Sequence, residues 1–182
     1  WEMKGRYPAI LSDEKQGAAA RQLFEDAQAM LKQIIDEKWF APKAVIGFWP
    51  ANALGDDIIL YADDSRTRER ATFFTLRQQL SKRDGKANVA LADFVAPASS
   101  GKPDYIGGFV VTAGIEEVAI SERFERANDD YSSILVKALA DRFAEAFAER
   151  MHEVVRKELW GYAADETLKP EDLIGEPYQG IR

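Results

Sequence analysis

Hydrophobic side chains recur at helical spacing near the start of the chain. Apolar residues follow one another at intervals of three and four positions across residues 23–35, which predicts a helix with one buried face. Ser12 or Asp13 is suited to cap the start of this helix, and Pro42 sets a limit that the helix should not pass. The first forty residues are therefore expected to be mainly helical.

A longer helical pattern occupies the second half of the chain. It predicts one helix over residues 116–128 and a long one over residues 131–160. Asp129 or Asp130 is suited to cap the long helix, because a short carboxylate accepts a hydrogen bond from the first turn. Gly161 is suited to end that helix.

Short apolar segments between these helices predict strands. The predicted strands cover residues 44–49, 58–61, 67–75, 88–95 and 105–113, with a short helix over residues 76–82. The first two strands are expected to form an antiparallel hairpin, and Arg66, Arg68 and Arg70 would alternate onto one face of the third. Because strands cluster and helices flank them, we expect an α+β fold with an antiparallel, twisted sheet and a long C-terminal helix.

Composition and charge narrow the function classes. Of the 182 residues, 46% are apolar and 30% charged, which is typical of a single globular domain. With 31 acidic and 24 basic residues, the net charge of −7 argues against nucleic acids and anionic membranes as partners. No apolar run approaches the roughly 18 residues that a membrane-spanning helix needs.

Cysteine and histidine usage limits the possible chemistry. The chain has no cysteine, so disulfides, thiolate metal sites and cysteine nucleophiles are excluded, and the composition fits the cytoplasm. The single histidine, His152, cannot form a zinc site of the usual kinds. We therefore expect no metal site and no catalytic residue of a hydrolytic triad.

One polar stripe on the predicted long helix could carry function. Lys137, Asp141, Glu145 and Glu149 are spaced four positions apart, so they share one face. Lys137 could pair with Asp141, while the three carboxylates form either a solvated face or a group that awaits a cation. Arg182 follows in a segment without helical or strand pattern, and its planar guanidinium is suited to clamp a carboxylate.

Sequence runs along the whole chain resemble one known family. The most specific runs are Trp49-Pro50-Ala51-Asn52, Trp160-Gly161-Tyr162-Ala163 and Tyr178-Gln179-Gly180-Ile181-Arg182, supported by residues 5–8, 55–58, 76–79, 91–97, 104–107, 129–131, 136–142 and 144–149. In this order they resemble the S-adenosylmethionine-binding reactivation domain of cobalamin-dependent methionine synthase.

The resemblance implies a module of a methyltransferase that forms methionine from homocysteine. Such a module binds S-adenosylmethionine and supports reductive remethylation of cob(II)alamin, which a partner domain of methionine synthase holds. A flavodoxin-type protein donates the electron, and the isolated fragment is not expected to turn over alone. The compartment implied is the cytoplasm.

The resemblance also assigns residues by position. Glu145 and Arg182 match ligand contacts for S-adenosylmethionine. Glu117, Asp141 and Glu176 match acidic positions that dock the cobalamin domain and receive the histidine displaced from cobalt.

The resemblance further implies a single reactivation domain, residues 1–182, that lacks the family's extreme N-terminal and C-terminal parts. An aspartate contact of the family would precede Trp1, and a Gly-Tyr loop would follow Arg182. Two alternatives remain open. Beside the S-adenosylmethionine-binding module, the chain could be a truncated docking module that binds S-adenosylmethionine weakly or not at all, or a plain α+β domain.

Overall fold

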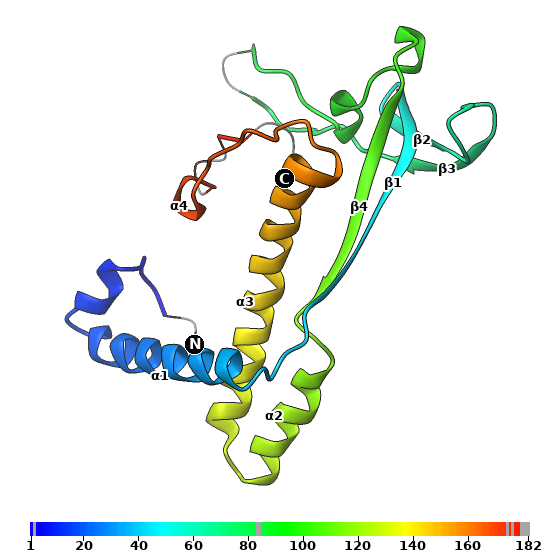
Figure 1. Ribbon diagram of the computed structural model, residues 1–182. Helices are drawn as coiled ribbons and strands as arrows, with labels where there is room; N and C mark the ends of the chain where they lie inside the picture. Colours follow the sequence, from blue (N-terminus) through cyan, green and yellow to red (C-terminus); the bar gives the residue numbers. More distant parts are fainter. Residues whose placement is uncertain (2, 83–84, 174, 176, 179–182) are drawn as a thin grey trace. The chain divides into compact units, whose positions relative to one another are not determined.

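The computed structural model describes residues 1–182 except residues 2, 83–84, 174, 176 and 179–182 (Figure 1). The chain divides into two compact units: a helical unit, Trp1–Ala44 with Val111–Arg182, and a sheet unit, Val45–Val110. Within the described residues, no helix is both long enough and apolar enough to cross a membrane.

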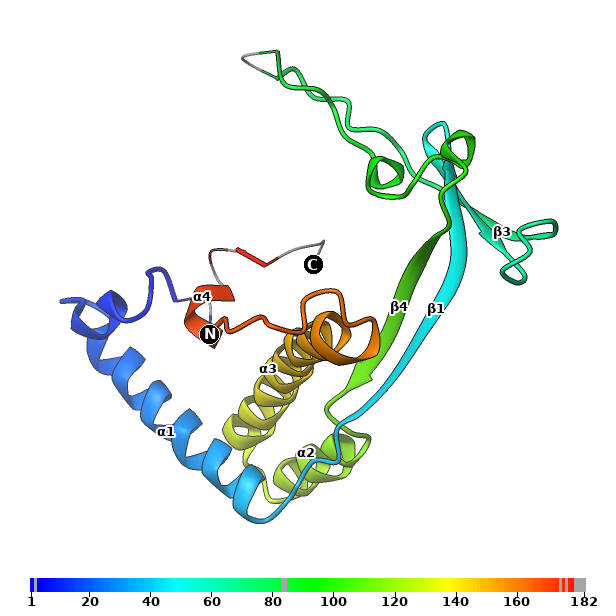
Figure 2. The same ribbon diagram turned by 45° about the horizontal axis from the view of Figure 1, so that its top comes forward.

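Three helices form the core of the helical unit: α1 (Gly17–Asp36), α2 (Glu116–Arg126) and α3 (Asp130–Val154). Figure 2 shows α3 with α1 and α2 packed against it. Their apolar faces bury a shared cluster that includes Ile34 and Val136, and Val136 is completely inaccessible to solvent. The core residues are Met30, Ile34, Phe40, Ala113, Leu135, Val136 and Ala140.

The observed ends of these helices agree with the predicted boundaries for α3 but not for α1. The predicted cap of α3 is confirmed, because a carboxylate oxygen of Asp129 accepts a hydrogen bond from the Ser132 backbone nitrogen at 3.0 Å. The first helix begins later than predicted, at Gly17. Asp13 instead accepts hydrogen bonds from the backbone nitrogens of the turn just before it.

The long helix ends in a change of winding. After α3 the chain forms one π-helical turn, η5 (Val155–Leu159), and Gly161 follows with a left-handed φ of 76°. The predicted glycine stop is therefore confirmed, because a left-handed residue closes the helix and glycine adopts it without strain. Only one short helix, α4 (Pro170–Leu173), was found in the described residues that follow.

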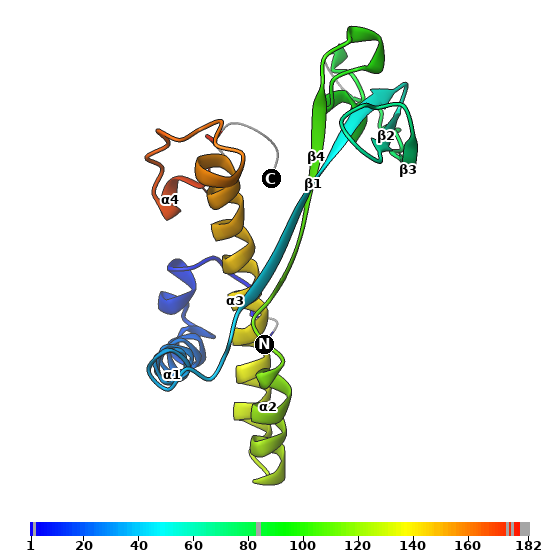
Figure 3. The same ribbon diagram turned by 45° about the vertical axis from the view of Figure 1, so that its right-hand side comes forward.

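Four strands form the sheet: β1 (Lys43–Leu54), β2 (Asp57–Tyr61), β3 (Glu69–Phe74) and β4 (Asp104–Thr112). Their order is β3-β2-β1-β4, and Figure 3 shows β1 and β4 side by side. The predicted hairpin is confirmed: β1 and β2 are antiparallel, with Leu54 opposite Asp57 and a turn at Gly55, whose φ is 63°.

β1 extends past the proline that was expected to end it. Pro50 lies inside the strand, directly before Ala51, the first residue paired with β2. Its missing N–H therefore leaves no gap in the ladder that joins residues 51–54 of β1 to β2. The inner residues Ala51, Ala53, Ile58 and Leu60 bury a second core together with Ala92.

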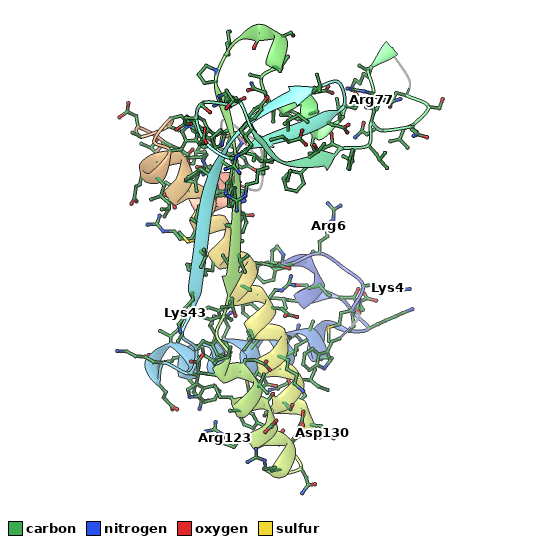
Figure 4. The ribbon with its side chains drawn as sticks, turned by 90° about the vertical axis from the view of Figure 1, so that its right-hand side faces the viewer. Lys4, Arg6, Lys43, Arg77, Arg123 and Asp130 are labelled. Atoms are coloured by element: carbon green, nitrogen blue, oxygen red, sulfur yellow. The ribbon has the colours of Figure 1, made fainter. Side chains whose placement is uncertain are left out.

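The segment between β3 and β4 does not match the sequence pattern. Residues 76–82 are not helical, and residues 88–95 contain the 3₁₀ helix η3 (Leu91–Phe94) instead of a strand. Polar contacts explain the difference. Arg77, labelled in Figure 4, pairs with Asp56 at 2.6 Å and with Asp93 at 2.7 Å, and Asp93 also accepts from the Ala90 backbone nitrogen.

Two further 3₁₀ helices complete the described elements, η1 (Ala9–Ser12) and η4 (Ala98–Ser100).

Candidate functional site

The acidic face of α3 presents Glu145 to solvent. The Glu145 carboxylate accepts a hydrogen bond from Arg142 at 2.8 Å, and the two side chains are 65% and 68% exposed. Surface pairs of this kind contribute only about 0–1 kcal/mol, because water screens both charges. Glu145 is thus a carboxylate that a stronger cationic partner can capture.

The charge pairs around this face differ from those predicted. Lys137 pairs with Glu125 of α2 at 2.7 Å, not with Asp141. Glu125 also accepts from the Ser133 hydroxyl at 3.0 Å, so two donors converge on it. The hydrogen bond from Lys137 is the main cause that lowers the pKa of Glu125, and the hydrogen bond from Ser133 lowers it further. The same contact with Glu125 raises the pKa of Lys137.

Glu117 lies in the first turn of α2 and is half-buried. One of its carboxylate oxygens is enclosed and has no hydrogen-bond partner among the described residues. Its charge makes a small contribution to the raised pKa of Lys137. Asp141 is exposed one turn beyond Lys137 on α3. The structure therefore places Glu117 and Asp141 on two helices that pack against each other.

Two of the predicted site residues, Glu176 and Arg182, lie outside the described residues. The terminal run is described up to Tyr178. The ring of Tyr178 lies over the Arg156 guanidinium, with 4.6 Å from the guanidinium carbon to the ring centroid.

Arg156 anchors this part of the helical unit. It is only 4% exposed, and it donates two hydrogen bonds to Glu166, each 2.7 Å long. Glu166 raises the pKa of Arg156, and Arg156 lowers the pKa of Glu166, which keeps both groups charged. Sequence reasoning missed this cluster. The one available signal was that Arg156 falls about three helical turns after Glu145, on nearly the same face.

A hollow lies in the sheet unit, and its lining contains none of the predicted site residues. Its volume is about 360 Å³, and its lining includes Asn52, Tyr61, Arg66 and Lys102. Arg66 and Arg68 both lie before β3, which begins at Glu69, and Arg66 has a left-handed φ of 54°. The predicted alternation of Arg66, Arg68 and Arg70 on one face of that strand is therefore wrong. Arg66 donates to backbone carbonyls of Ala51 and Asp104 and to the Asn52 side chain, which ties three segments together.

The basic residues of α2 are also engaged. The guanidinium of Arg123, labelled in Figure 4, lies 5.3 Å from the ring of Trp39 and 5.2 Å from that of Phe124. In the part of the chain that the structure describes, no group of three or more acidic or histidine side chains is arranged to hold a metal ion.

Comparison with known proteins agrees with this α+β architecture and its long C-terminal helix. A family model described as the activation domain of vitamin B12-dependent methionine synthase matches residues 1–182. The chain belongs to this family.

A solved structure supports the assignment. The chain is similar to a crystal structure of the MetH reactivation domain bound to AdoHcy, with 55% sequence identity and a TM-score of 0.88. The match covers 100% of this chain and 56% of that one, so the chain spans about half the length of its structural relative. The predicted family and fold class are thereby confirmed.

Proposed function

We propose that this chain binds S-adenosylmethionine and supports reductive remethylation of cob(II)alamin in methionine synthase. The observation that carries the proposal is the match of the entire chain, at 55% identity, to a reactivation domain bound to AdoHcy. AdoHcy is the compound that remains when S-adenosylmethionine gives up its methyl group. A protein surface that holds one therefore presents the contacts needed by the other.

Glu145 and Arg182 are the proposed ligand contacts. S-adenosylmethionine carries a sulfonium, an ammonium and a carboxylate. Arg182 would hold the carboxylate through two parallel hydrogen bonds, and Glu145 would lie near the positive groups. The exposure of Glu145 and its weak pairing with Arg142 support this role, because a ligand ammonium can replace Arg142 at little cost.

Glu117, Asp141 and Glu176 are the proposed docking residues for the cobalamin-binding domain. A histidine that leaves the cobalt is favoured in its protonated form beside carboxylates, because a negative charge raises its pKa. The enclosed oxygen of Glu117, which lacks a partner among the described residues, supports the idea that an incoming donor completes this group.

The proposed chemical role of this chain is to align the methyl donor and to exclude water. Reduced cobalamin supplies the nucleophile, so the chain needs no general base. Its residues would orient the methyl donor and shield it from solvent. The electron would come from a flavodoxin-type protein, and the proposed compartment is the cytoplasm.

Calorimetric titration of the 182-residue chain with S-adenosylmethionine tests the proposal. We expect micromolar binding, and we expect Glu145→Gln to raise Kd about tenfold, which corresponds to about 1.4 kcal/mol. Glu122→Gln is the matched control, since Glu122 forms a similarly exposed intrahelical pair with Arg126 at 2.7 Å. Its Kd should equal that of the wild type.

Absence of detectable heat at millimolar ligand would contradict the proposal and favour a module that docks without binding the ligand. A second titration, with a cobalamin-binding domain, tests the docking residues. Glu117→Gln should weaken that complex, while Glu122→Gln should not.

A further inference from the structure

The contacts of Glu125 fix the register between α2 and α3. The two helices are joined by residues 127–129 and pack against each other, so they run antiparallel (Figure 1). Glu125, near the end of α2, accepts hydrogen bonds from Ser133 and Lys137, near the start of α3. These contacts determine which residues of the two helices lie at the same level.

The two proposed docking carboxylates of the described residues lie at one level of this helix pair. Glu117 precedes Glu125 by eight residues, and Asp141 follows Ser133 by eight residues. Because each residue adds 1.5 Å along a helix, both positions lie about 12 Å from the contact between Glu125 and Ser133. Lys137, four residues after Ser133 and four before Asp141, is halfway between these two levels.

Lys137 therefore has acidic groups on both sides of it along the helix pair. Its ammonium donates to Glu125 at 2.7 Å, and this contact is the main cause of its raised pKa. The negative charge of Glu117 raises the pKa of Lys137 further, so these two charges also interact. Asp141 is one turn further along α3, at the spacing where opposite charges on a helix meet. The lysine stem is flexible, so small differences in free energy decide which carboxylate it takes.

A buried hydroxyl favours Glu125 as the partner of Lys137. Ser133 is 2% exposed, and its hydroxyl donates to the Glu125 carboxylate at 3.0 Å. This bond and the bond from Lys137 end on the same oxygen, Oε1. Lys137 and Glu125 are about half exposed, so their attraction alone is weak. The buried donor adds a fixed acceptor, which draws the ammonium toward the end of α2.

We propose that Glu125 and Ser133 are positioning residues that keep the ammonium of Lys137 away from Glu117 and Asp141. The inference rests on the proposed function, in which these two carboxylates receive a protonated histidine of the cobalamin-binding domain. An ammonium paired with them would have to be displaced first, and its charge would repel the incoming imidazolium. The enclosed oxygen of Glu117, without a partner among the described residues, agrees with a carboxylate kept open for a donor.

Titration of variants of the 182-residue chain with a cobalamin-binding domain of methionine synthase tests this role. Glu125→Gln removes the charge that holds Lys137, and it should raise Kd about fivefold, because the ammonium then pairs with the docking carboxylates. Lys137→Met removes the competing ammonium, so its Kd should not exceed that of the wild type. In the double variant, Glu125→Gln with Lys137→Met, Kd should return to within about twofold of the wild type.

The salt bridge between Glu122 and Arg126 is the matched control, since it is also exposed and also 2.7 Å long, but lies within α2. Glu122→Gln and Arg126→Met change the net charge as the two test variants do. Each should bind the domain within about twofold of the wild type. Equal effects in the test pair and the control pair would show that only net charge matters, and would overturn the inference.

The double variant separates positioning from stability. If it binds as weakly as Glu125→Gln, loss of the salt bridge itself weakens docking, and the inference is overturned. Unchanged binding in Glu125→Gln overturns it as well. Thermal unfolding followed by circular dichroism shows that each variant is folded at the temperature of the titration.

The outcome also distinguishes this inference from the proposed function. A wild-type chain that does not bind the cobalamin-binding domain overturns the proposed docking role and the inference together. A wild-type chain that binds, and that weakens on Glu117→Gln but not on Glu125→Gln, overturns the positioning role alone.

Discussion

The buried pair of Arg156 and Glu166 allows a quantitative prediction about stability. Replacing Glu166 by leucine leaves the guanidinium of Arg156, 4% exposed, without its charged partner. Replacing Arg156 by methionine likewise leaves the carboxylate of Glu166 without its charged partner. The double variant, Arg156→Met with Glu166→Leu, removes both charges and fills their space with apolar atoms.

The magnitude follows from the burial of the pair. Removal of one partner from a buried pair costs about 3–5 kcal/mol, because the remaining charge is desolvated and uncompensated. We expect about 3 kcal/mol for either single variant, since Glu166 lies in a non-helical segment that can relax toward water. For a chain of this size, that loss lowers the thermal midpoint by roughly 6–12 °C. The double variant should lose less than either single one.

Thermal unfolding followed by far-ultraviolet circular dichroism measures these changes. The comparison requires all four proteins, the wild type, the two single variants and the double variant, at one pH and ionic strength. If the single losses simply add in the double variant, the two groups are not coupled. Single losses below about 1 kcal/mol would place the pair with ordinary surface pairs and refute the reasoning.

Two further predictions concern a carboxylate in each unit. Arg77 holds the pKa of Asp93 at about 2, so its contribution to stability is complete above the unfolded pKa of about 4. That contribution disappears as the pH falls toward 2. The thermal midpoints of the wild type and of Asp93→Asn should therefore converge between pH 4 and pH 2. A difference between the two midpoints that stays constant over this range would contradict the prediction. Asp129→Ala removes the α3 cap and should cost about 1 kcal/mol in urea unfolding. Asp130→Ala, which removes no cap, should cost less than half as much.

Periodic patterns predicted the elements whose stability comes from one buried face. α2 and α3 have apolar positions at helical spacing, and the cap at Asp129 and the stop at Gly161 bound α3 with its final π turn. These signals are local, so the sequence contains them within a few residues.

The segment after β3 could not be predicted in the same way. Its apolar residues alternate much as those of a strand do, but polar contacts decide its conformation. Arg77 reaches Asp56, 21 positions away, and Asp93, 16 positions away, and these contacts favour an irregular path with the short helix η3. No local pattern reports a partner at such a distance.

In the candidate site, too, local spacing was predictable from the sequence, whereas contacts between distant residues were not. The four-residue spacing correctly placed Asp141 and Glu145 on one helix, but it wrongly paired Lys137 with Asp141, because Glu125 from α2 competes for the same ammonium. The cluster around Arg156 joins residues 10 and 22 positions apart, and only the folded chain brings them together.

A crystal structure of this chain with S-adenosylmethionine tests the central claim most directly. We expect the ligand carboxylate within about 3 Å of the Arg182 guanidinium, and the ligand's positive groups beside Glu145 in place of Arg142. A ligand bound elsewhere, or Arg182 and Glu145 on opposite sides of α3 with no ligand between them, would contradict the account.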